Sequence, residues 1–347
     1  MRTKSAVERR KPTMLDVAAH AHVSAMTVSR ALAGDSNVSL EKRQRVTEAI
    51  DALGYRRNET ARNLRTGGIT GLLGLVVTNL ANPFYSLFAL GVESVAGENG
   101  LRVVLTNTDE NVESERQVVE ELASRGVDGM IVVPAGSSHG HLHPDNLGGM
   151  PIVLGVRPPT AVPLDCVLVD DFGGARGATA QLIKQGHTRI GFLGLPPSVW
   201  TSSERFRGFC VALEDGDITL YEEYVRLRQR TIDAAEDAAL ELLNLEQPPT
   251  AIFCANSRNT LGAIRALNIT GRTAGIAGFD DFELADVLGV PLTIVAYEPR
   301  ELGRRAAELL IERMSQRNAG NPTPPQRIVI PTTVLEYGSQ PRINQDR

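Results

Sequence analysis

The feature that most constrains the fold is an alternation of short apolar runs with longer amphipathic segments, which begins near residue 69. The run GLLGLVV at 71–77 is typical of a buried strand, and LFALGVESVAGENG at 87–100 is typical of a helix that ends at a glycine. Such alternation predicts parallel sheets that are covered by helices on both faces. One series runs to PIVLGV at 151–156, and a second begins with CVLVDD at 166–171. The sequence therefore predicts two doubly wound α/β lobes.

The ends of the predicted strands are where a site is expected, because doubly wound sheets bind ligands beyond the carboxyl ends of their strands. An enzyme would need a base beside a nucleophile, or a metal cluster, and we find no phosphate loop, dinucleotide fingerprint or nucleophile elbow. His139, His141 and His143 form an H-x-H-x-H run that could bind a metal, but we interpret it as a solvated surface loop. We expect no catalytic residues, no metal and no cofactor. The strand ends instead offer hydrogen-bonding and stacking groups suited to a small polar ligand.

Composition places the chain among globular proteins. It has 347 residues, 42% hydrophobic and 22% charged, which is too long for one small core. No apolar run approaches the ~18–20 residues of a membrane-spanning helix, and the basic start MRTKSAVERRKPT has no apolar signal segment behind it. The three cysteines stand far apart, as in a reducing compartment. We therefore expect a cytoplasmic protein that makes no contact with membranes.

Charge is unevenly distributed along the chain. Residues 1–66 carry 13 Lys and Arg against 7 Asp and Glu, whereas the remaining residues carry 23 against 34. A basic head on an acidic body suggests that the head binds a polyanion, although a plain basic tail would also give positive charge.

Three short helices are predicted in this head. Thr13 and Asp16 match a capping box that begins the first helix, and Ser24 can cap the second. Ser39 can cap the third, which Gly54 ends. The predicted helices lie near 14–21, from 24 to 32 and from about 40 to 53.

A tight turn between the first two helices predicts a helix-turn-helix unit, in which the first turn of the second helix enters the major groove of DNA. The inward stripe of that helix consists of Val28, Ala31 and Leu32. Ala25 and Met26 are then expected to contact base edges, and Arg30 a guanine or a phosphate. The small polar residues suited to phosphate contacts are Thr27, Ser29 and Asn37. A three-helix bundle of any kind needs caps and an inward stripe, so the pattern alone leaves both interpretations open.

The run TMLDVAAHAHVSAMTVSRALAGDSNVSLEKRQRVTEAIDALGYRRNETARNLRTG closely resembles the headpiece of the lactose/galactose-repressor family of bacterial transcription regulators. The matching features are T-x-x-D-V-A, V-S-x-x-T-V-S-R, V-S-x-x-x-R, L-G-Y-x-x-N and A-R-x-L. The resemblance continues over essentially the whole chain. It implies a small all-α helix-turn-helix headpiece and a two-lobed, periplasmic-binding-protein-like (type I) effector domain with doubly wound parallel sheets.

The domains that this resemblance implies follow the chain in order. They are a basic tail at 1–11, the headpiece at 12–58, a hinge helix and linker at 59–68, an effector-binding and dimerisation domain at 69–338, and a tail at 339–347. In the family the chain recrosses between the lobes, so we expect an N-lobe at about 69–165 plus 299–325 and a C-lobe at about 166–298 plus 326–338. The end of the chain lacks the heptad leucines of a tetramerising helix, so we expect a homodimer whose two heads span a pseudo-palindromic operator.

DNA contacts extend beyond the helix-turn-helix unit in this family. The hinge helix forms only on DNA, and here it would be residues 59–65. By resemblance, Leu64 is the wedge that enters the minor groove, and Arg65 matches a position that reads that groove. An ordinary core leucine is the alternative for Leu64, but its neighbours are polar. The DNA-binding residues expected are Thr13, Ser24, Ala25, Met26, Thr27, Ser29, Arg30, Asn37, Tyr55, Asn58, Ala61, Leu64 and Arg65.

The effector contacts are also implied by the resemblance. They are Asn82, Phe84, Tyr85, Asp170, Trp200, Thr201, Arg205, Asn256 and Asp280. A planar Arg205 fork with Asn and Asp acceptors can read adjacent hydroxyls of a sugar. Trp200 either stacks on the sugar or is a hydrophobic plug at a lobe edge. Arg230 suggests an acidic ligand, such as a sugar acid or a phosphosugar.

The function that follows is a sequence-specific transcriptional repressor, cytoplasmic and associated with the nucleoid. A small polar effector, a sugar or sugar derivative, would bind between the lobes and control operator affinity allosterically. The sequence does not indicate whether the effector releases the protein from DNA or promotes binding. A solute-binding transport protein and a doubly wound enzyme are the alternatives, and neither explains the head.

Overall fold

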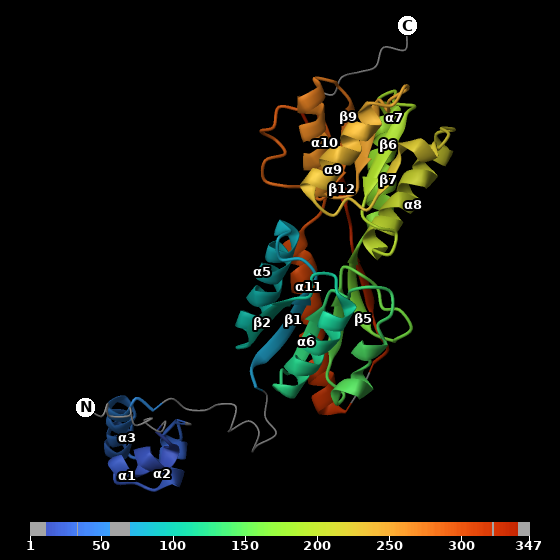
Figure 1. The fold of residues 1–347 in the computed structure, drawn as a ribbon. Helices are drawn as coiled ribbons and strands as arrows, with labels where there is room; N and C mark the ends of the chain where they lie inside the picture. Colours follow the sequence, from blue (N-terminus) through green and yellow to red (C-terminus); the bar gives the residue numbers. More distant parts are fainter. Residues whose placement is uncertain (1–11, 33, 56–69, 321–322, 339–347) are drawn as a thin grey trace, which may run out of the picture. The chain divides into compact units, whose positions relative to one another are not determined.

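The computed structural model describes residues 12–32, 34–55, 70–320 and 323–338. The described residues divide into two units, one that extends to Thr70 and one that begins at Gly71. The first unit contains helices α1 (Met14–His20), α2 (Ala25–Leu32) and α3 (Leu40–Leu53) (Figure 1). Their spans agree with those predicted from caps and periodicity. The predicted hinge at 59–68 and its residues Ala61, Leu64 and Arg65, together with Asn58, lie outside the described residues.

Local hydrogen bonds begin and end these three helices. Thr13 and Asp16 form the predicted capping box: the Asp16 N–H donates to Thr13 Oγ1 at 3.4 Å, and the Thr13 N–H donates to Asp16 Oδ2 at 2.7 Å. The Thr27 N–H donates to Ser24 Oγ at 3.1 Å. Gly54 ends α3 in the left-handed conformation, with a φ of 62°, which glycine adopts at little cost. The small core of this unit contains Val17, Ala18, Ala21, Val28, Val46 and Ala49.

The second unit contains two six-stranded sheets. The first has the order β11-β5-β4-β3-β1-β2, and all of its pairs are parallel. Its strands are β1 (Leu72–Val77), β2 (Arg102–Asn107), β3 (Gly129–Val132), β4 (Ile152–Gly155), β5 (Asp165–Val169) and β11 (Arg327–Ile330). Its helices are α5 (Pro83–Glu98), α6 (Val112–Ser124) and α11 (Pro299–Ala319), with short 3-10 turns η1 (Gly140–Leu142) and η2 (Pro144–Leu147). Helices α5 and α11 pack on one face of this sheet, in a different hydrophobic cluster from α6.

The second sheet repeats the same plan. Its order is β12-β10-β9-β8-β6-β7, and only the β10–β12 pair is antiparallel. Its strands are β6 (Ile190–Gly194), β7 (Val225–Leu227), β8 (Ala251–Cys254), β9 (Gly275–Phe279), β10 (Leu292–Ala296) and β12 (Thr333–Tyr337). Its helices are α7 (Asp171–Lys184), α8 (Trp200–Asp215), α9 (Ile232–Leu243) and α10 (Ser257–Thr270), with a 3-10 turn η3 (Glu222–Tyr224). Helix α7 packs on α8, and α9 packs on α10. The two predicted doubly wound lobes are thus present.

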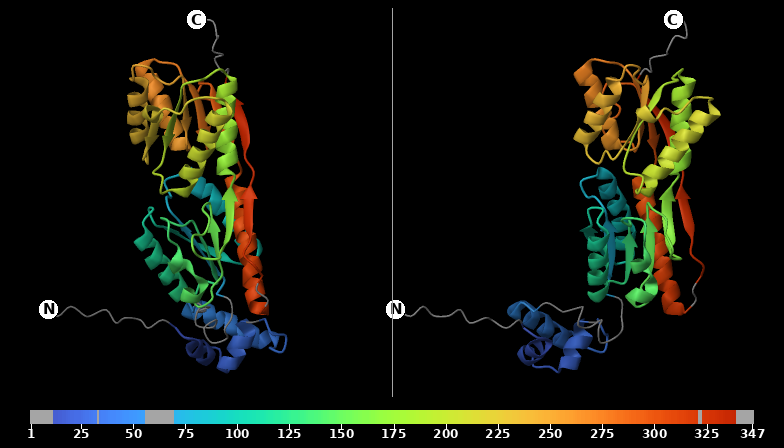
Figure 2. Two further views of the ribbon diagram at one scale, coloured as in Figure 1. Left: turned by 90° about the vertical axis from the view of Figure 1, so that its right-hand side faces the viewer. Right: turned by 45° about the vertical axis from the view of Figure 1, so that its right-hand side comes forward.

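The predicted lobe boundaries at 165/166 and 325/326 are wrong, because each lies one strand too early. Strand β5 pairs with β4, and β11 pairs with β5, so both strands belong to the first sheet. The chain therefore passes to the second lobe after Val169, and again between Ile330 and Thr333. Figure 2 shows β11 and β12, both in red, in different lobes. An apolar run such as CVLVDD does not indicate which of two sheets it joins, since both need buried parallel strands.

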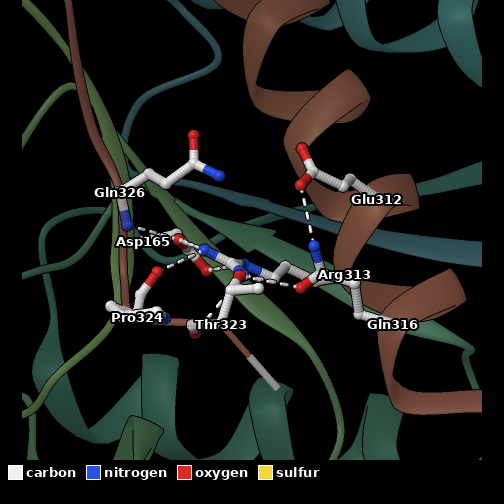
Figure 3. Close-up of polar contacts among 7 residues, drawn as sticks. All are labelled: Asp165, Glu312, Arg313, Gln316, Thr323, Pro324 and Gln326. Atoms are coloured by element: carbon white, nitrogen blue, oxygen red, sulfur yellow. Dashed lines mark hydrogen bonds and ion pairs between the residues drawn. The ribbon is translucent and has the colours of Figure 1, made fainter. Parts of the chain in front are cut away.

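A polar cluster holds the end of α11 to the strands beside it (Figure 3). Arg313 on α11 donates to both carboxylate oxygens of Asp165, at 2.8 and 2.7 Å, and to the Pro324 carbonyl at 2.8 Å. The Gln326 N–H donates to Asp165 Oδ1 at 2.7 Å. These contacts join α11, the start of β5 and the segment that leads into β11.

Candidate functional site

The outward face of α2 carries the residues predicted to read DNA. Met26 is 63% exposed, whereas Val28 is fully buried against the core. The Arg30 side chain is 58% exposed, and its Nε lies 3.9 Å from Asp35 Oδ2. This loose ion pair leaves the guanidinium accessible. Ala25 and Ser29 are partly exposed on the same short helix, so the face offers apolar, hydroxyl and cationic contacts within two turns.

Two of the small polar residues predicted to anchor phosphates, Thr27 and Asn37, already make local hydrogen bonds, as does the cap residue Ser24. Ser24 Oγ lies 2.9 Å from Thr27 Oγ1 and accepts the Thr27 N–H. Asn37 donates from both its backbone N–H and its Nδ2 to Asp35 Oδ1, each at 2.9 Å. Tyr55 packs against the headpiece core. These residues stabilise the unit, and their DNA contacts stay a prediction.

A cavity in the second unit collects residues from the ends of strands in both sheets. Of the predicted effector residues, Asn82, Phe84, Tyr85, Thr201, Arg205, Asn256 and Asp280 line it. The remaining lining residues are Asn79, Glu110, Val156, Arg157, Leu195, Arg230, Arg258 and Tyr297. The topology explains this convergence, because parallel strands bring their carboxyl ends and the helix N-termini that follow to one edge.

Asp170 and Trp200, predicted to contact the effector, do not line this cavity. Asp170 is the N-cap of α7, and its Oδ1 accepts the Gly173 N–H at 2.8 Å. Trp200 lies in the first turn of α8 but packs against the hydrophobic cluster of the first lobe that contains Met130 and Leu168. The structure thus agrees with the alternative interpretation of Trp200 as a hydrophobic plug.

Arg205 is a buried cation of the cavity that several partners hold in place. It is 6% exposed, and its Nε donates to Asp171 Oδ1 at 2.7 Å, while its Nη1 donates to the Ala255 carbonyl at 2.6 Å. Asp280 Oδ1 lies 3.5 Å from Nη1, and the guanidinium carbon lies 3.6 Å from the centre of the Phe279 ring. Burial raises the pKa of Asp171 to about 7, against the opposing effect of the Arg205 charge. Asp171 was not predicted as a site residue from the sequence, and the neighbouring Asp170 was predicted instead.

A second pair in the cavity was also missed. Arg157 is 5% exposed and holds Glu110 through two bonds, Nη1 to Oε2 at 2.8 Å and Nη2 to Oε1 at 2.5 Å. Its Nη1 also donates to the Pro134 carbonyl at 2.7 Å. Glu110 and Asp280 have φ values of 59° and 71°, a region that L-residues adopt at a cost. No sequence pattern signals a pair that is 47 residues apart.

Comparison with known proteins identifies the family. Residues 70–337 match the model for periplasmic binding proteins and the sugar binding domain of the LacI family, and residues 13–58 match the model for bacterial regulatory proteins of the lacI family. The chain belongs to the LacI family. It is therefore a DNA-binding transcription regulator, as its headpiece and two-lobed domain predicted.

Individual relatives extend this result over nearly the full length. The HTH-type transcriptional regulator CelR of Thermobifida fusca is 34% identical over 346 residues, covering 94% of this chain and 98% of that protein. A transcriptional regulator CelR-cellobiose complex superposes with a TM-score of 0.68 at 30% identity, covering 94% of this chain and all of that one. The lac repressor dimer bound to operator and the anti-inducer ONPF gives a TM-score of 0.81 at 24% identity, with 94% and 98% covered. This last likeness shows the shared fold.

The histidine run of this LacI-family chain differs from the solvated loop that we predicted. His139 is 3% exposed, and its Nδ1 accepts the Thr160 N–H at 3.0 Å. His141 Nε2 lies 2.8 Å from Oε1 of the fully buried Glu115, whose Oε2 accepts the Ala135 N–H at 2.6 Å. His139 and His141 are thus part of the first lobe's interior, whereas the His143 side chain is 37% exposed. Across the described ranges, no three His, Cys, Asp or Glu side chains are grouped to hold a metal ion, and none of the helices there combines the length and apolar character needed to span a bilayer.

Proposed function

We propose that this chain is a sequence-specific repressor whose α2 helix lies in the major groove of its operator. The exposed Met26 and the partly buried Ala25 beside it would choose the bases through apolar contacts, and Arg30 would pair with a guanine or a phosphate. The observation that supports this most directly is the outward face of α2, where Met26 is 63% exposed while Val28 anchors the helix. The cytoplasm, where the chromosome lies, is the expected place of action.

The protein is proposed to act as a homodimer, so that two headpieces bind the two halves of a pseudo-palindromic operator. An exposed apolar surface in the second unit supports this. Leu90 on α5 is 48% exposed, and Leu284 and Val287 in the segment after β9 are 58% and 69% exposed. A groove lined by Leu87 of α5 and by Leu284 joins these two segments. Exposed apolar patches of this kind commonly mark protein interfaces.

A small polar effector, a sugar or sugar derivative, is proposed to bind in the cavity between the lobes and to control operator affinity. Asp280, Asn256 and Arg205 supply acceptors and donors for hydroxyl groups. Cellobiose in the complex of the relative CelR supports a carbohydrate. Because the chain passes between the lobes at several points, a ligand that contacts both lobes can favour one lobe angle and so change the fit of the dimer to DNA. We expect ligand binding without catalytic turnover.

Selection of DNA from a random pool by the full chain tests the operator proposal, followed by fluorescence anisotropy on the selected sequence. We expect a pseudo-palindromic site. Arg30→Ala removes one base or phosphate contact from each headpiece of the dimer, so it should weaken binding roughly tenfold per headpiece and roughly a hundredfold in all. Met26→Ala should change the preferred base at one position in each half-site. The control Gln44→Ala alters an exposed residue of α3 and should leave affinity unchanged. Equal affinity of the wild type for selected and scrambled DNA would refute the proposal.

A further inference from the structure

The cavity between the lobes is lined by four arginines, and two of them have no carboxylate partner among the described residues. Arg157 is paired with Glu110, and Arg205 with Asp171 and Asp280. Arg230 and Arg258 line the same cavity, yet within the described ranges no Asp or Glu oxygen forms an ion pair with either. Both also line the adjoining hollow at the mouth of the cavity. The unpaired positive charge is therefore concentrated at one end of the site.

Arg258 lies in the first turn of α10 and reaches the other lobe. Its Nη2 donates to the carbonyl of Ala81 at 2.9 Å, a residue 177 positions away in the chain. A guanidinium has five N–H donors, and this is the one hydrogen bond that the Arg258 side chain makes to the described residues. The side chain is thus held at the mouth of the cavity by a single neutral acceptor.

Arg230 follows strand β7, in a loop that is fixed to its surroundings. The backbone N–H groups of Arg228 and Gln229 both donate to the carbonyl of Gly194, at 2.9 and 3.0 Å. The Gln229 carbonyl accepts from Asn259 Nδ2 on α10 at 2.9 Å. The backbone before Arg230 is therefore tied to the end of β6 and to the helix that carries Arg258.

The nearby acids neutralise these two cations only in part. Burial opposes ionisation of Glu110, but the bonds and charge of Arg157 and, more weakly, the charge of Arg230 hold its pKa below the usual value. Both oxygens of Glu110 accept bonds from Arg157. Asp109 lines the same mouth, but it is exposed and forms no ion pair with Arg230 or Arg258. An exposed carboxylate without direct contact is screened by water and salt, so it competes weakly with a bound anion.

The start of α8 adds a further positive element to the cavity. Its N-cap is the apolar Val199, which makes no side-chain capping bond, and Thr201 in its first turn lines the cavity. The neighbouring helices α5 and α10 are capped by the side chains of Asn82 and Asn256. An uncapped helix start offers N–H donors and a partial positive charge to an anion.

We propose that the effector carries an anionic group, a carboxylate or a phosphate, which Arg230 and Arg258 bind at the mouth of the cavity. This inference rests on the proposed function. The guanidinium fork matches the geometry of both anions, while the polar body of the ligand faces Arg205, Asn256 and Asp280. Because Arg258 also contacts Ala81, an anion on Arg258 binds at the junction of the lobes and helps to fix their angle.

Matched pairs of neutral and anionic ligands test this on the full chain by isothermal titration calorimetry at constant ionic strength. The pairs are cellobiose with cellobionate, glucose with gluconate, and glucose with glucose 6-phosphate, and inorganic phosphate is added as a separate probe. We expect one anionic member to bind more tightly than its neutral partner, and the pair in which this occurs distinguishes carboxylate from phosphate. Arg230→Gln should reduce that affinity roughly tenfold to a hundredfold, as expected for a hydrogen bond to a charged group. The affinity of Arg230→Lys for the anion should lie between those of the wild type and Arg230→Gln, since lysine keeps the charge but loses the planar guanidinium fork.

Arg228→Gln is the matched control, because Arg228 is an exposed arginine of the same loop that does not line the cavity. It should bind every ligand like the wild type. The inference is overturned if no anion binds more tightly than its neutral partner. It is also overturned if the Arg230→Gln protein still binds the anion more tightly than the neutral partner by the same factor as the wild type. A neutral sugar that binds equally to the wild type and to Arg230→Gln, and that alters operator affinity, would refute the anionic effector while leaving the regulatory function intact. If the wild type shows no sequence-selective DNA binding, the proposed repressor function itself is refuted.

Discussion

Replacing Asp165 by asparagine should destabilise the effector domain, because this carboxylate joins three separate segments (Figure 3). It accepts two bonds from Arg313, at 2.8 and 2.7 Å, and a third from the Gln326 N–H at 2.7 Å. Both side chains of the ion pair are only 10% exposed. Asparagine has the same shape, but it offers one acceptor and points an NH₂ group toward donors.

The magnitude follows from what the substitution leaves behind. Breaking a buried ion pair by removing one partner costs about 3–5 kcal/mol. Arg313 would keep its bonds to the Pro324 carbonyl and to Gln316 Oε1, at 2.8 and 2.7 Å, so its charge stays partly satisfied. We therefore expect a loss of about 2–3 kcal/mol in the free energy of unfolding, below the full cost of an orphaned charge.

Urea unfolding measures this change, followed by circular dichroism and by the fluorescence of Trp200, the single tryptophan of the chain. The control is Asp215→Asn, which removes a similar arginine contact, Arg176 to Asp215 at 2.7 Å, between side chains that are 52% and 51% exposed. An exposed pair contributes about 0–1 kcal/mol, so the control should unfold close to the wild type. Equal effects of the two substitutions would refute the reasoning that burial sets the value of the Asp165 contacts.

Two further predictions concern helix packing and pH. Gly303→Ala on α11 should destabilise by about 1–3 kcal/mol in thermal or urea unfolding, because the added Cβ would collide with the Phe88 carbonyl of α5. Gly97→Ala on the open side of α5 should instead stabilise by up to about 1 kcal/mol. A stability change of the same sign for both substitutions would contradict the close contact between α5 and α11. Asp171 has a folded pKa of about 7, raised from 3.8, so its contribution to stability is complete below its unfolded pKa and is lost as the pH rises toward 7. Asp171→Asn removes this titration, and its stability relative to the wild type should rise between about pH 4 and 7 by up to ~1.4 kcal/mol per pH unit. If urea titrations show that the difference in unfolding free energy between Asp171→Asn and the wild type does not change with pH, the raised pKa of Asp171 is excluded.

The sequence by itself determined those features that depend on residues close together in the chain. The capping box of Thr13 and Asp16, the Ser24 cap and the glycine that ends α3 are all contacts within a few residues, so the local order of residues is sufficient to predict them. The strand and helix alternation similarly followed from hydrophobic periodicity, which reports burial on one face or two. The three helices of the first unit and the two doubly wound lobes were predictable for this reason.

Tertiary structure alone decided which side chains meet in the cavity. Arg205 binds Asp171 and Arg157 binds Glu110 across 34 and 47 residues, and neither pairing has a signature in the sequence. Adjacent residues such as Asp170 and Asp171 differ only in direction: the first caps α7, while the second turns inward to Arg205. The same limit applied to Trp200 and to the lobe assignment of β5. Local pattern sets how a segment folds, but the position of its side chains depends on packing against segments that are distant in the chain.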